Sequence, residues 1–378
     1  MTDQKFNKIF PFDTPRKYQR ELIEQVLDAY QKGKHHVILN APTGIGKSAI
    51  SFAIANFFKT AYVLTSQKIL QEQYYRELNI PYVLGKTNYA CSRNKNLNCE
   101  MGECKGAFNC SQECPYVHAR QTAINTQISN FNYSLFLMIN RASFQLPKRN
   151  LIVCDECHNL ENYLINTSTL SISKKTLENL SIQSFIQIPK VKDNEEYKFN
   201  WLFTDLKRAM VNEWTKIEDN LKRVNKWEFL KKAANWGSKK RMVGNYLDAI
   251  VKIEEMYNLG QKIVLTQDKD DAIEFKILFG NKLFEHMIAP YGSYFLHMSA
   301  TVLSKENFCG TLGLIPDDVE YIQCESTFPV ENRMIYYDPV GSMVMKEKER
   351  TLPYLVEEIK KILNKYPNEK GIIHTVNY

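Results

Sequence analysis

Short apolar runs alternate along the chain with segments whose apolar side chains recur at helical spacing. Runs that are apolar throughout are typical of strands buried on both faces of a parallel sheet, and they lie at residues 37–39, 61–64, 151–154 and 294–296. Helical spacing precedes the first run at residues 13–33 and follows it at residues 49–55. The repeated order of strand and helix predicts an α/β fold with a doubly wound parallel sheet.

The first strand runs into a loop that ends in a Lys-Ser pair. Gly44 and Gly46 let the backbone curl so that several N–H groups point inward. Lys47 can then reach terminal phosphates, and the Ser48 hydroxyl can hold Mg²⁺. The next helix would aim its positive end at the same phosphates. The loop predicts a nucleoside triphosphate site formed by Ala41, Pro42, Thr43, Gly44, Ile45, Gly46, Lys47 and Ser48, although Ala41 stands where the strict pattern has glycine.

Two polar residues near the front of the helix expected at residues 13–33 add to this site. Gln19 could pair with both edges of an adenine, because its amide offers a donor and an acceptor. Arg16 could lie over or beside the base. A polar helix start is common by itself, but these residues lie about one strand before the phosphate loop. We therefore expect the nucleotide to be ATP.

Two adjacent carboxylates follow the strand at residues 151–154. Asp155 is placed to hold Mg²⁺ through water, and Glu156 to accept a proton from the attacking water. His158 would sense the γ-phosphate region and pass that information towards a nucleic-acid site. A lone Asp-Glu pair usually marks a solvated strand end. Here a buried strand precedes the pair and Cys-His follows it, which predicts a hydrolytic site.

Length and charge bound the class of protein. The chain has 378 residues, enough for two or three domains, and its net charge of +7 favours a polyanionic partner. Thr65, at the end of a buried strand, is well placed to touch a phosphate backbone. The N-terminus has no apolar signal core, and the longest apolar run, residues 135–139, is far too short to span a bilayer. We expect a cytoplasmic protein with no membrane partner.

The cysteines concentrate in one polar stretch. Five of the nine lie within residues 91–114, namely Cys91, Cys99, Cys104, Cys110 and Cys114. Cytosolic chains rarely carry a disulfide framework, and the polar residues 92–96 cannot build a core around scattered thiols. Thiolate ligation of a metal is the leading interpretation. Zn²⁺ and an iron–sulfur cluster both take four cysteines, so this chemistry leaves both open.

Residues 165–265 have a helical, charged pattern and contain all four tryptophans. Tryptophans among lysines and arginines could form a stacking platform for single-stranded nucleic acid. The first three, however, lie thirteen residues apart, which puts them on nearly opposite sides of a helix with 3.6 residues per turn. Core packing within a small helical domain is the better interpretation for most of them.

Several motifs follow one another in the order found in one helicase family. Residues 155–158, Asp-Glu-Cys-His, are similar to the DEAH box of superfamily 2 helicases, and residues 299–301 form the Ser-Ala-Thr motif expected after it. Residues 325–333 resemble a Ser-Pro-Phe-Pro…Asn-Arg signature, with Thr327 where proline is common. Residues 371–378 resemble the strand that begins a second motor domain. From about residue 10 to its last residue, the chain resembles the XPD/DinG-like iron–sulfur DNA helicases.

The resemblance implies a P-loop RecA-like motor domain with two insertions, followed by an incomplete second RecA-like domain. It favours a [4Fe–4S] cluster over zinc, with Cys91 and Cys114 as border ligands, Cys110 as the third, and Cys99 or Cys104 as the fourth. It places Asn130 facing the DNA path. It assigns the coupling of nucleotide and DNA to Ser299, Ala300 and Thr301. The implied boundaries are 1–85, 121–164 and 266–305 for the motor, 86–120 for the cluster, 165–265 for a helical Arch, and 306–378 for the start of motor domain 2.

The expected activity is ATP-dependent translocation on single-stranded or forked DNA with unwinding, and the resemblance implies 5′-to-3′ polarity. Because such a motor needs a second RecA-like domain, we expect this chain alone to bind its ligands but to be weak or inactive. A separate chain could supply the rest of that domain. Two alternatives stay open: a non-catalytic nucleotide- and DNA-binding subunit of a split motor, and a zinc-stabilised DNA-dependent ATPase.

Overall fold

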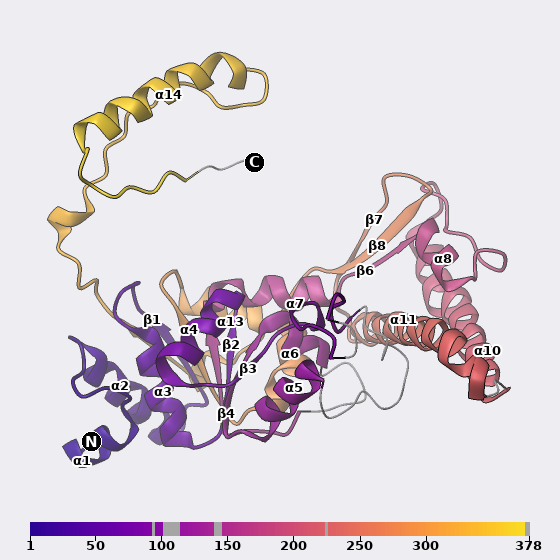
Figure 1. Cartoon of the computed structure of the whole chain (residues 1–378), viewed down its shortest axis with the longest axis horizontal. Helices are drawn as coiled ribbons and strands as arrows, with labels where there is room; N and C mark the ends of the chain where they lie inside the picture. The colour runs from indigo at the N-terminus through magenta and orange to yellow at the C-terminus, as the bar shows by residue number, and fades with distance from the viewer. Residues whose placement is uncertain (93–94, 101–113, 140–145, 224–225, 375–378) are drawn as a thin grey trace. The chain divides into compact units, whose positions relative to one another are not determined.

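The computed structural model describes residues 1–378 except 93–94, 101–113, 140–145, 224–225 and 375–378. The chain divides into two compact units, Met1–Thr327 and Phe328–Tyr378 (Figure 1).

A seven-stranded sheet forms the centre of the first unit, with the strand order β10-β1-β9-β5-β2-β4-β3. Every pairing in it is parallel. The strands are β1 (His36–Asn40), β2 (Ala61–Thr65), β3 (Tyr82–Val83), β4 (Ile128–Asn132), β5 (Leu151–Asp155), β9 (Tyr294–Ser299) and β10 (Val319–Gln323). The predicted α/β fold with a parallel sheet is confirmed.

Helices cover both faces of this sheet, as its fully apolar strands require. Neighbouring strand residues enter opposite cores: Val37 and Leu39 belong to one apolar cluster, whereas Ile38 belongs to the other. The first cluster is completed by α1 (Asp3–Ile9), α2 (Gln19–Gln31), α3 (Lys47–Phe58) and α4 (Lys68–Leu78). The second is completed by α5 (Pro115–Asn125), α6 (Tyr133–Ile139), α7 (Leu160–Ser168), α12 (Asn281–Met287) and α13 (Lys305–Leu312).

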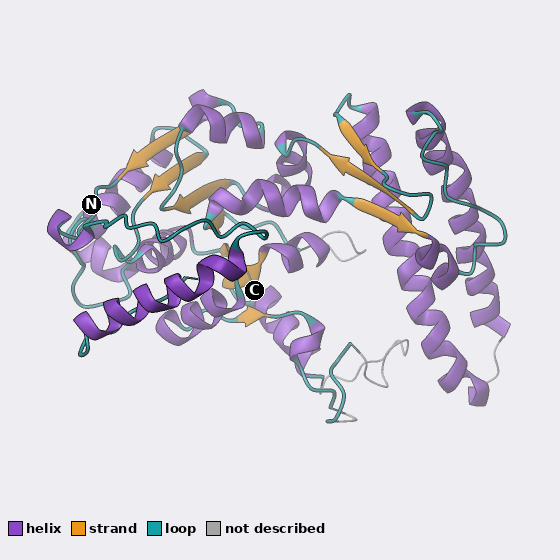
Figure 2. Ribbon diagram, turned by 90° about the horizontal axis from the view of Figure 1, so that it is seen from above, coloured by secondary structure: helices purple, strands orange, loops and turns teal. Residues whose placement is uncertain are grey.

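The region expected to be a helical Arch contains a second, antiparallel sheet (Figure 2). Its order is β6-β8-β7, formed by β6 (Leu170–Ser173), β7 (Ile263–Thr266) and β8 (Ala272–Ile277). The helices between β6 and β7 are α8 (Lys174–Leu180), α9 (Glu195–Asn200), a π-helix (Trp201–Leu206), α10 (Lys207–Arg223) and α11 (Lys226–Asn258). The expected boundary at residue 265 is wrong, because β8 pairs with β6 and so belongs to this insertion.

Helices α10 and α11 run antiparallel and are joined by ion pairs. Lys207 pairs with Glu254, Lys239 with Glu213 and Lys240 with Glu218. Trp201 is buried and Trp214 packs under Lys240, whose Nζ lies 4.6 Å from the indole centroid. These two tryptophans therefore serve packing, as predicted, rather than a stacking platform.

The end of the first unit also differs from the expected boundary. Strand β10 pairs in parallel with β1 over its whole length, so residues 306–327 belong to the first unit and complete its seven-stranded sheet, and they do not begin a second domain. In the second unit, the helix expected at residues 350–365 is present as α14 (Lys348–Lys365). Residues 371–374, expected to begin a strand, have no regular structure, and the rest of that motif lies outside the described residues.

Candidate nucleotide-binding site

The carboxyl ends of three neighbouring strands bring the predicted site residues together. In the register of the sheet Asn40, which ends β1, pairs with Ser299, and Asp155, which ends β5, pairs with Met298 of β9. Ligands of open parallel sheets bind at this edge, outside the carboxyl ends of the strands. The phosphate loop, the Asp-Glu pair and the Ser-Ala-Thr motif are far apart in sequence but adjoin here.

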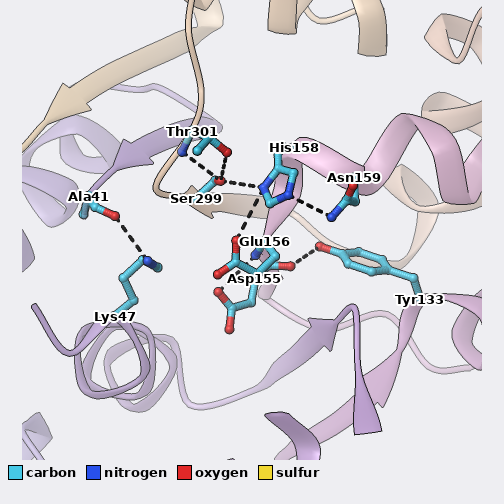
Figure 3. A network of polar contacts seen from close by, with 9 residues as sticks. All are labelled: Ala41, Lys47, Tyr133, Asp155, Glu156, His158, Asn159, Ser299 and Thr301. Atoms are coloured by element: carbon cyan, nitrogen blue, oxygen red, sulfur yellow. Dashed lines mark hydrogen bonds and ion pairs between the residues drawn. The ribbon is translucent and has the colours of Figure 1, made fainter. Parts of the chain in front are cut away.

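The loop after β1 has the backbone that a phosphate cradle needs. Gly44 and Gly46 have φ angles of 85° and 83°, a left-handed conformation that glycine adopts without steric cost. Helix α3 begins directly at Lys47. The Lys47 Nζ donates to the Ala41 carbonyl oxygen at 3.2 Å (Figure 3). Lys47 therefore lies folded back across the loop, where its ammonium group can turn to a phosphate.

Gln19 and Arg16 hold this loop from outside. Gln19 is buried, and its Nε2 donates to the carbonyls of Ile45 (3.0 Å) and Gly46 (3.3 Å), while its Oε1 accepts from the Arg16 N–H (2.8 Å). The Arg16 guanidinium donates to the Gly44 carbonyl. In this structure the Gln19 amide is thus engaged with the loop backbone, and its predicted pairing with adenine would require these bonds to exchange.

The start of the helix that carries Gln19 differs from the expectation. Helix α2 begins at Gln19 and not near residue 13, because Tyr18 has a left-handed backbone with φ 69°. Asp13, Thr14 and Pro15 therefore lie outside the helix. This places Arg16 in a loop facing the phosphate cradle.

A cavity of about 430 Å³ joins these elements. Its walls include Arg16, Gln19, Lys47, Ser48, Asp155 and Glu156, the residues predicted to bind and hydrolyse ATP. Phe12 and Thr14 also line it, although neither was predicted to bind the nucleotide. The Phe12 ring is about half exposed, which suits stacking on a base. An aromatic residue shortly before Arg16 was the available signal.

Asp155 is buried at the end of β5, and both of its oxygens are held. Its Oδ1 accepts from the Glu156 N–H at 3.0 Å, and its Oδ2 accepts from the Tyr74 hydroxyl at 3.0 Å. Burial, followed by the nearby Glu156 carboxylate, raises the pKa of Asp155 to about 6. Mg²⁺ commonly uses one or two carboxylates together with substrate phosphates and water. Asp155 and the Ser48 hydroxyl, on the same cavity, fit that ligand set.

A chain of polar contacts joins the Asp-Glu pair to the Ser-Ala-Thr motif (Figure 3). The His158 Nδ1 lies 2.7 Å from the Ser299 Oγ and 3.4 Å from the Glu156 Oε2. The Ser299 Oγ accepts from the Thr301 N–H at 3.2 Å. Ala300 lies between these two residues, directly after β9. The histidine thus connects the side chain of Glu156, just after β5, with that of Ser299 at the end of β9.

The two residues expected at the DNA path are inaccessible in this structure. Thr65 and Asn130 are fully buried, and the Thr65 hydroxyl donates to the Asn130 Oδ1 at 3.3 Å. Gln71 of α4 donates to the carbonyls of Val83 and Asn130 beside them. Their side chains therefore hold β2 and β4 together beneath α4, and in this arrangement they cannot touch a DNA backbone.

Three of the five clustered cysteines belong to the described residues. Cys91, Cys99 and Cys114 are buried, and the thiols of Cys99 and Cys114 lie 3.7 Å apart. Burial raises the pKa of the Cys99 thiol to about 11. Within the described residues, no three His, Cys, Asp or Glu side chains gather closely enough to hold a metal ion. Cys110, the expected third ligand, and Cys104, the alternative to Cys99 as the fourth, lie outside the described residues.

Comparisons with known proteins agree with this geometry. Residues 13–188 match the family described as the type III restriction enzyme, res subunit. A probable ATP-dependent helicase of Methanocaldococcus jannaschii is 25% identical over 204 residues, which cover 43% of this chain and 31% of that protein. The family match includes the phosphate loop and the Asp-Glu pair.

Solved structures identify the fold. An XPD helicase aligns with 82% of this chain and 63% of its own, at a TM-score of 0.54 and 15% identity. Xpd4 of S. tokodaii aligns with 93% of this chain and 69% of its own, at a TM-score of 0.52 and 15% identity. In fold, the chain is similar to XPD helicases. The predicted resemblance and the RecA-like core are therefore confirmed.

This chain spans less than a third of the curated relative and under two thirds of the XPD helicase that it matches. Among its described residues, no helix combines the length and apolar character that a membrane crossing needs.

Proposed function

We propose that this chain is the first motor domain of an ATP-dependent DNA helicase that moves along single-stranded DNA. The observation that carries the proposal is the meeting of Lys47, Asp155 and Glu156 on one cavity at the carboxyl edge of the sheet. The names of the M. jannaschii relative and of the XPD helicases support the same class of reaction. The net charge of +7 supports a polyanionic partner.

Each residue has a proposed role in hydrolysis. Lys47 leaves the Ala41 carbonyl and binds the terminal phosphates, while Ser48 and Asp155 hold Mg²⁺, which neutralises phosphate charge when bound. Glu156 accepts a proton from the attacking water. His158, bonded to Ser299, relays the state of the nucleotide to β9 and the Ser-Ala-Thr motif. Gln19 and Arg16 keep the phosphate loop in its receptive shape.

Two substitutions in the complete motor test the hydrolytic assignment. Lys47→Ala should abolish both ATP binding and DNA-stimulated turnover, because the phosphates lose their cation. Glu156→Gln should keep ATP binding and lower turnover by about 10²–10⁴, the usual contribution of a positioned general base. ATP binding by calorimetry and phosphate release with single-stranded DNA measure the two effects. Normal hydrolysis by Glu156→Gln would remove Glu156 from its role.

The direction of movement and the form of the DNA are part of the same proposal. We propose 5′-to-3′ movement and loading on forked or single-stranded DNA, supported by the resemblance of the motifs to XPD/DinG-like helicases. Strand displacement by the complete motor on forks with a single 5′ or 3′ arm distinguishes the two polarities. Unwinding that needs a 3′ arm would overturn the proposed direction.

A [4Fe–4S] cluster in residues 86–120 is a further part of the proposal. Buried Cys91, Cys99 and Cys114, with two thiols in contact, supply donors of the right chemistry. The cluster would fold a polar stretch that has few apolar residues of its own. Anaerobically purified protein should contain about four irons per chain, and Cys114→Ser should lose most of them. One zinc and no iron would support the zinc-stabilised alternative.

We also propose that groups beyond this chain complete the nucleotide site. Among its described walls Arg16 is the only arginine, and Arg16 is bonded to the loop itself. A helicase of this type uses a second RecA-like domain to supply an arginine to the γ-phosphate. In the second unit, α14 leaves apolar residues exposed, including Leu352, Val356, Ile362 and Leu363, which suits packing against the rest of such a domain or a separate chain.

A further inference from the structure

Tyr74 of α4 is a buried tyrosine whose hydroxyl reaches the predicted metal site. It is 1% exposed, so its hydroxyl must find partners inside the protein. One partner is Asp155, 81 residues further along the chain, whose Oδ2 lies 3.0 Å from the tyrosine oxygen. The other is the Ser51 Oγ of α3 at 3.2 Å.

These contacts fix the carboxylate of Asp155 from both sides. The Glu156 N–H binds Oδ1 and the Tyr74 hydroxyl binds Oδ2, so the plane of the carboxylate has little freedom to turn. Each oxygen keeps a lone pair for a cation or for metal-bound water. An isolated carboxylate at a strand end would have no such restraint on its second oxygen.

The same hydroxyl connects Asp155 to the phosphate loop. Ser51 is fully buried, and its Oγ lies 2.9 Å from the Ser48 carbonyl oxygen. Because the Tyr74 proton is donated to Asp155, the single Ser51 hydroxyl proton is donated either to the Tyr74 oxygen or to the Ser48 carbonyl oxygen. Ser48 is the loop residue whose hydroxyl is proposed to hold Mg²⁺. Tyr74 therefore stands between the two elements that carry the proposed metal ligands, α3 and β5. A tyrosine retained only for packing would not need to join both.

We propose that Tyr74 is a positioning residue that orients Asp155 relative to Ser48 for Mg²⁺ bound with the nucleotide. This inference rests on the proposed function, because it concerns the same site. Partners that orient metal ligands commonly contribute about 10–100-fold to metal affinity. Tyr74 itself contacts neither metal nor substrate.

The test compares Tyr74→Phe with Tyr75→Phe in the complete motor. Tyr75 is the next residue on α4, but its side chain is half exposed and packs edge-on against Tyr82, so it is a matched control. Mn²⁺ in place of Mg²⁺ is titrated with protein and ATP and followed by electron paramagnetic resonance. ATP binding in EDTA and thermal unfolding are measured on the same samples.

Tyr74→Phe should weaken Mn²⁺ binding about tenfold or more, while ATP affinity in EDTA changes less than about twofold because Lys47 and the loop are untouched. Turnover should recover at high Mg²⁺, and Tyr75→Phe should behave as wild type. If Tyr74→Phe does not fold, Ser51→Ala serves instead and should weaken Mn²⁺ binding in the same direction, by a smaller factor.

The outcomes separate this inference from the function on which it rests. Wild-type Mn²⁺ affinity in a folded Tyr74→Phe protein would overturn the role of Tyr74 alone. Equal weakening in both tyrosine variants would also overturn it, since the effect would then be a general property of α4. A wild-type protein that binds no metal–nucleotide complex would overturn the proposed function and this inference together.

Discussion

Burial of the Asp155 carboxyl on the candidate nucleotide cavity lowers the stability of the folded protein at neutral pH. This carboxyl is nearly inaccessible, and burial raises its pKa to about 6 although two hydrogen bonds and Lys47 favour the ionised form. The folded protein therefore binds this proton more tightly than the unfolded chain does. Above pH 6 the ionised carboxylate reduces the free energy of unfolding, and below the ordinary aspartate pKa of 3.8 the penalty is absent because both states hold the proton.

Asp155→Asn should therefore stabilise the metal-free protein at neutral pH. Asparagine keeps the shape, accepts from the Glu156 N–H and can donate to the Tyr74 oxygen, while it removes the buried charge. From about 1.4 kcal/mol per pKa unit, we expect a gain of about 2–3 kcal/mol at pH 7.5 in EDTA, shrinking as the pH falls from 6 towards 4. Thermal unfolding across this pH range measures it. A variant less stable than wild type at pH 7.5 would contradict the account.

Some residues of the candidate site can be predicted from sequence motifs, whereas others are identified only from the folded structure. Lys47, Asp155 and His158 could be predicted because each stands in a short motif behind a strand. Tyr74 could not, because nothing near it in sequence distinguishes it from the neighbouring Tyr75. The burial of Thr65 and Asn130 was also unpredictable, since a polar strand residue can face either solvent or an adjacent helix such as α4.

Among the elements, four strands of the parallel sheet (β1, β2, β5 and β9) were predictable because burial on both faces requires continuous apolar runs. The antiparallel sheet was missed because each of its strands is short and its partners are distant: Leu170 pairs with Phe275. Strand β10 was missed for the same reason, since its partner β1 lies near the other end of the unit. The start of α2 was misplaced because a left-handed Tyr18 is not visible in a pattern of apolar spacing.

The phosphate loop needs a glycine at position 46 for its positive φ angle and for the close approach of Gln19. Substitutions at Gly46 and at Gly33 distinguish these two reasons. The Gly46 φ of 83° is strained for any other residue, and an added Cβ would lie 2.4 Å from the Gln19 Nε2. Gly46→Ala should therefore displace Gln19 and lower ATP affinity more than tenfold. Gly33→Ala is the control, because Gly33 has a φ of 87° but open space around its Cβ position.

In that control, backbone strain alone should cost about 1–2 kcal/mol of stability and leave ATP binding unchanged. Calorimetric ATP binding and thermal unfolding of both variants provide the comparison. If Gly46→Ala binds ATP as well as Gly33→Ala does, close packing of Gln19 on the loop is not needed for the cradle.

For the whole molecule, the boundary between units bears on activity. The sheet edge at β10 closes the first unit at Thr327, so every described wall of the candidate nucleotide cavity lies within Met1–Thr327. The described part of the second unit holds a single long helix, α14, with no sheet to cover its apolar side. We therefore expect binding of ATP to need only the first unit, and hydrolysis of ATP to need further groups from outside it.

We expect residues 1–378 alone to bind ATP and single-stranded DNA but to hydrolyse ATP negligibly. Binding requires the cavity within the first unit, whose phosphate loop, Asp155 and Glu156 are in place. Fast hydrolysis also needs an arginine at the γ-phosphate, a contribution of about 10³–10⁵ in rate in related NTPases, and Arg16 is already held by the Gly44 carbonyl. DNA-stimulated phosphate release by the isolated chain is the measurement, with the complete motor as reference and Glu156→Gln as the background. Robust stimulated turnover by a monomer of this chain would show that the first unit and α14 suffice, and the proposal of a completing domain or partner would have to be abandoned.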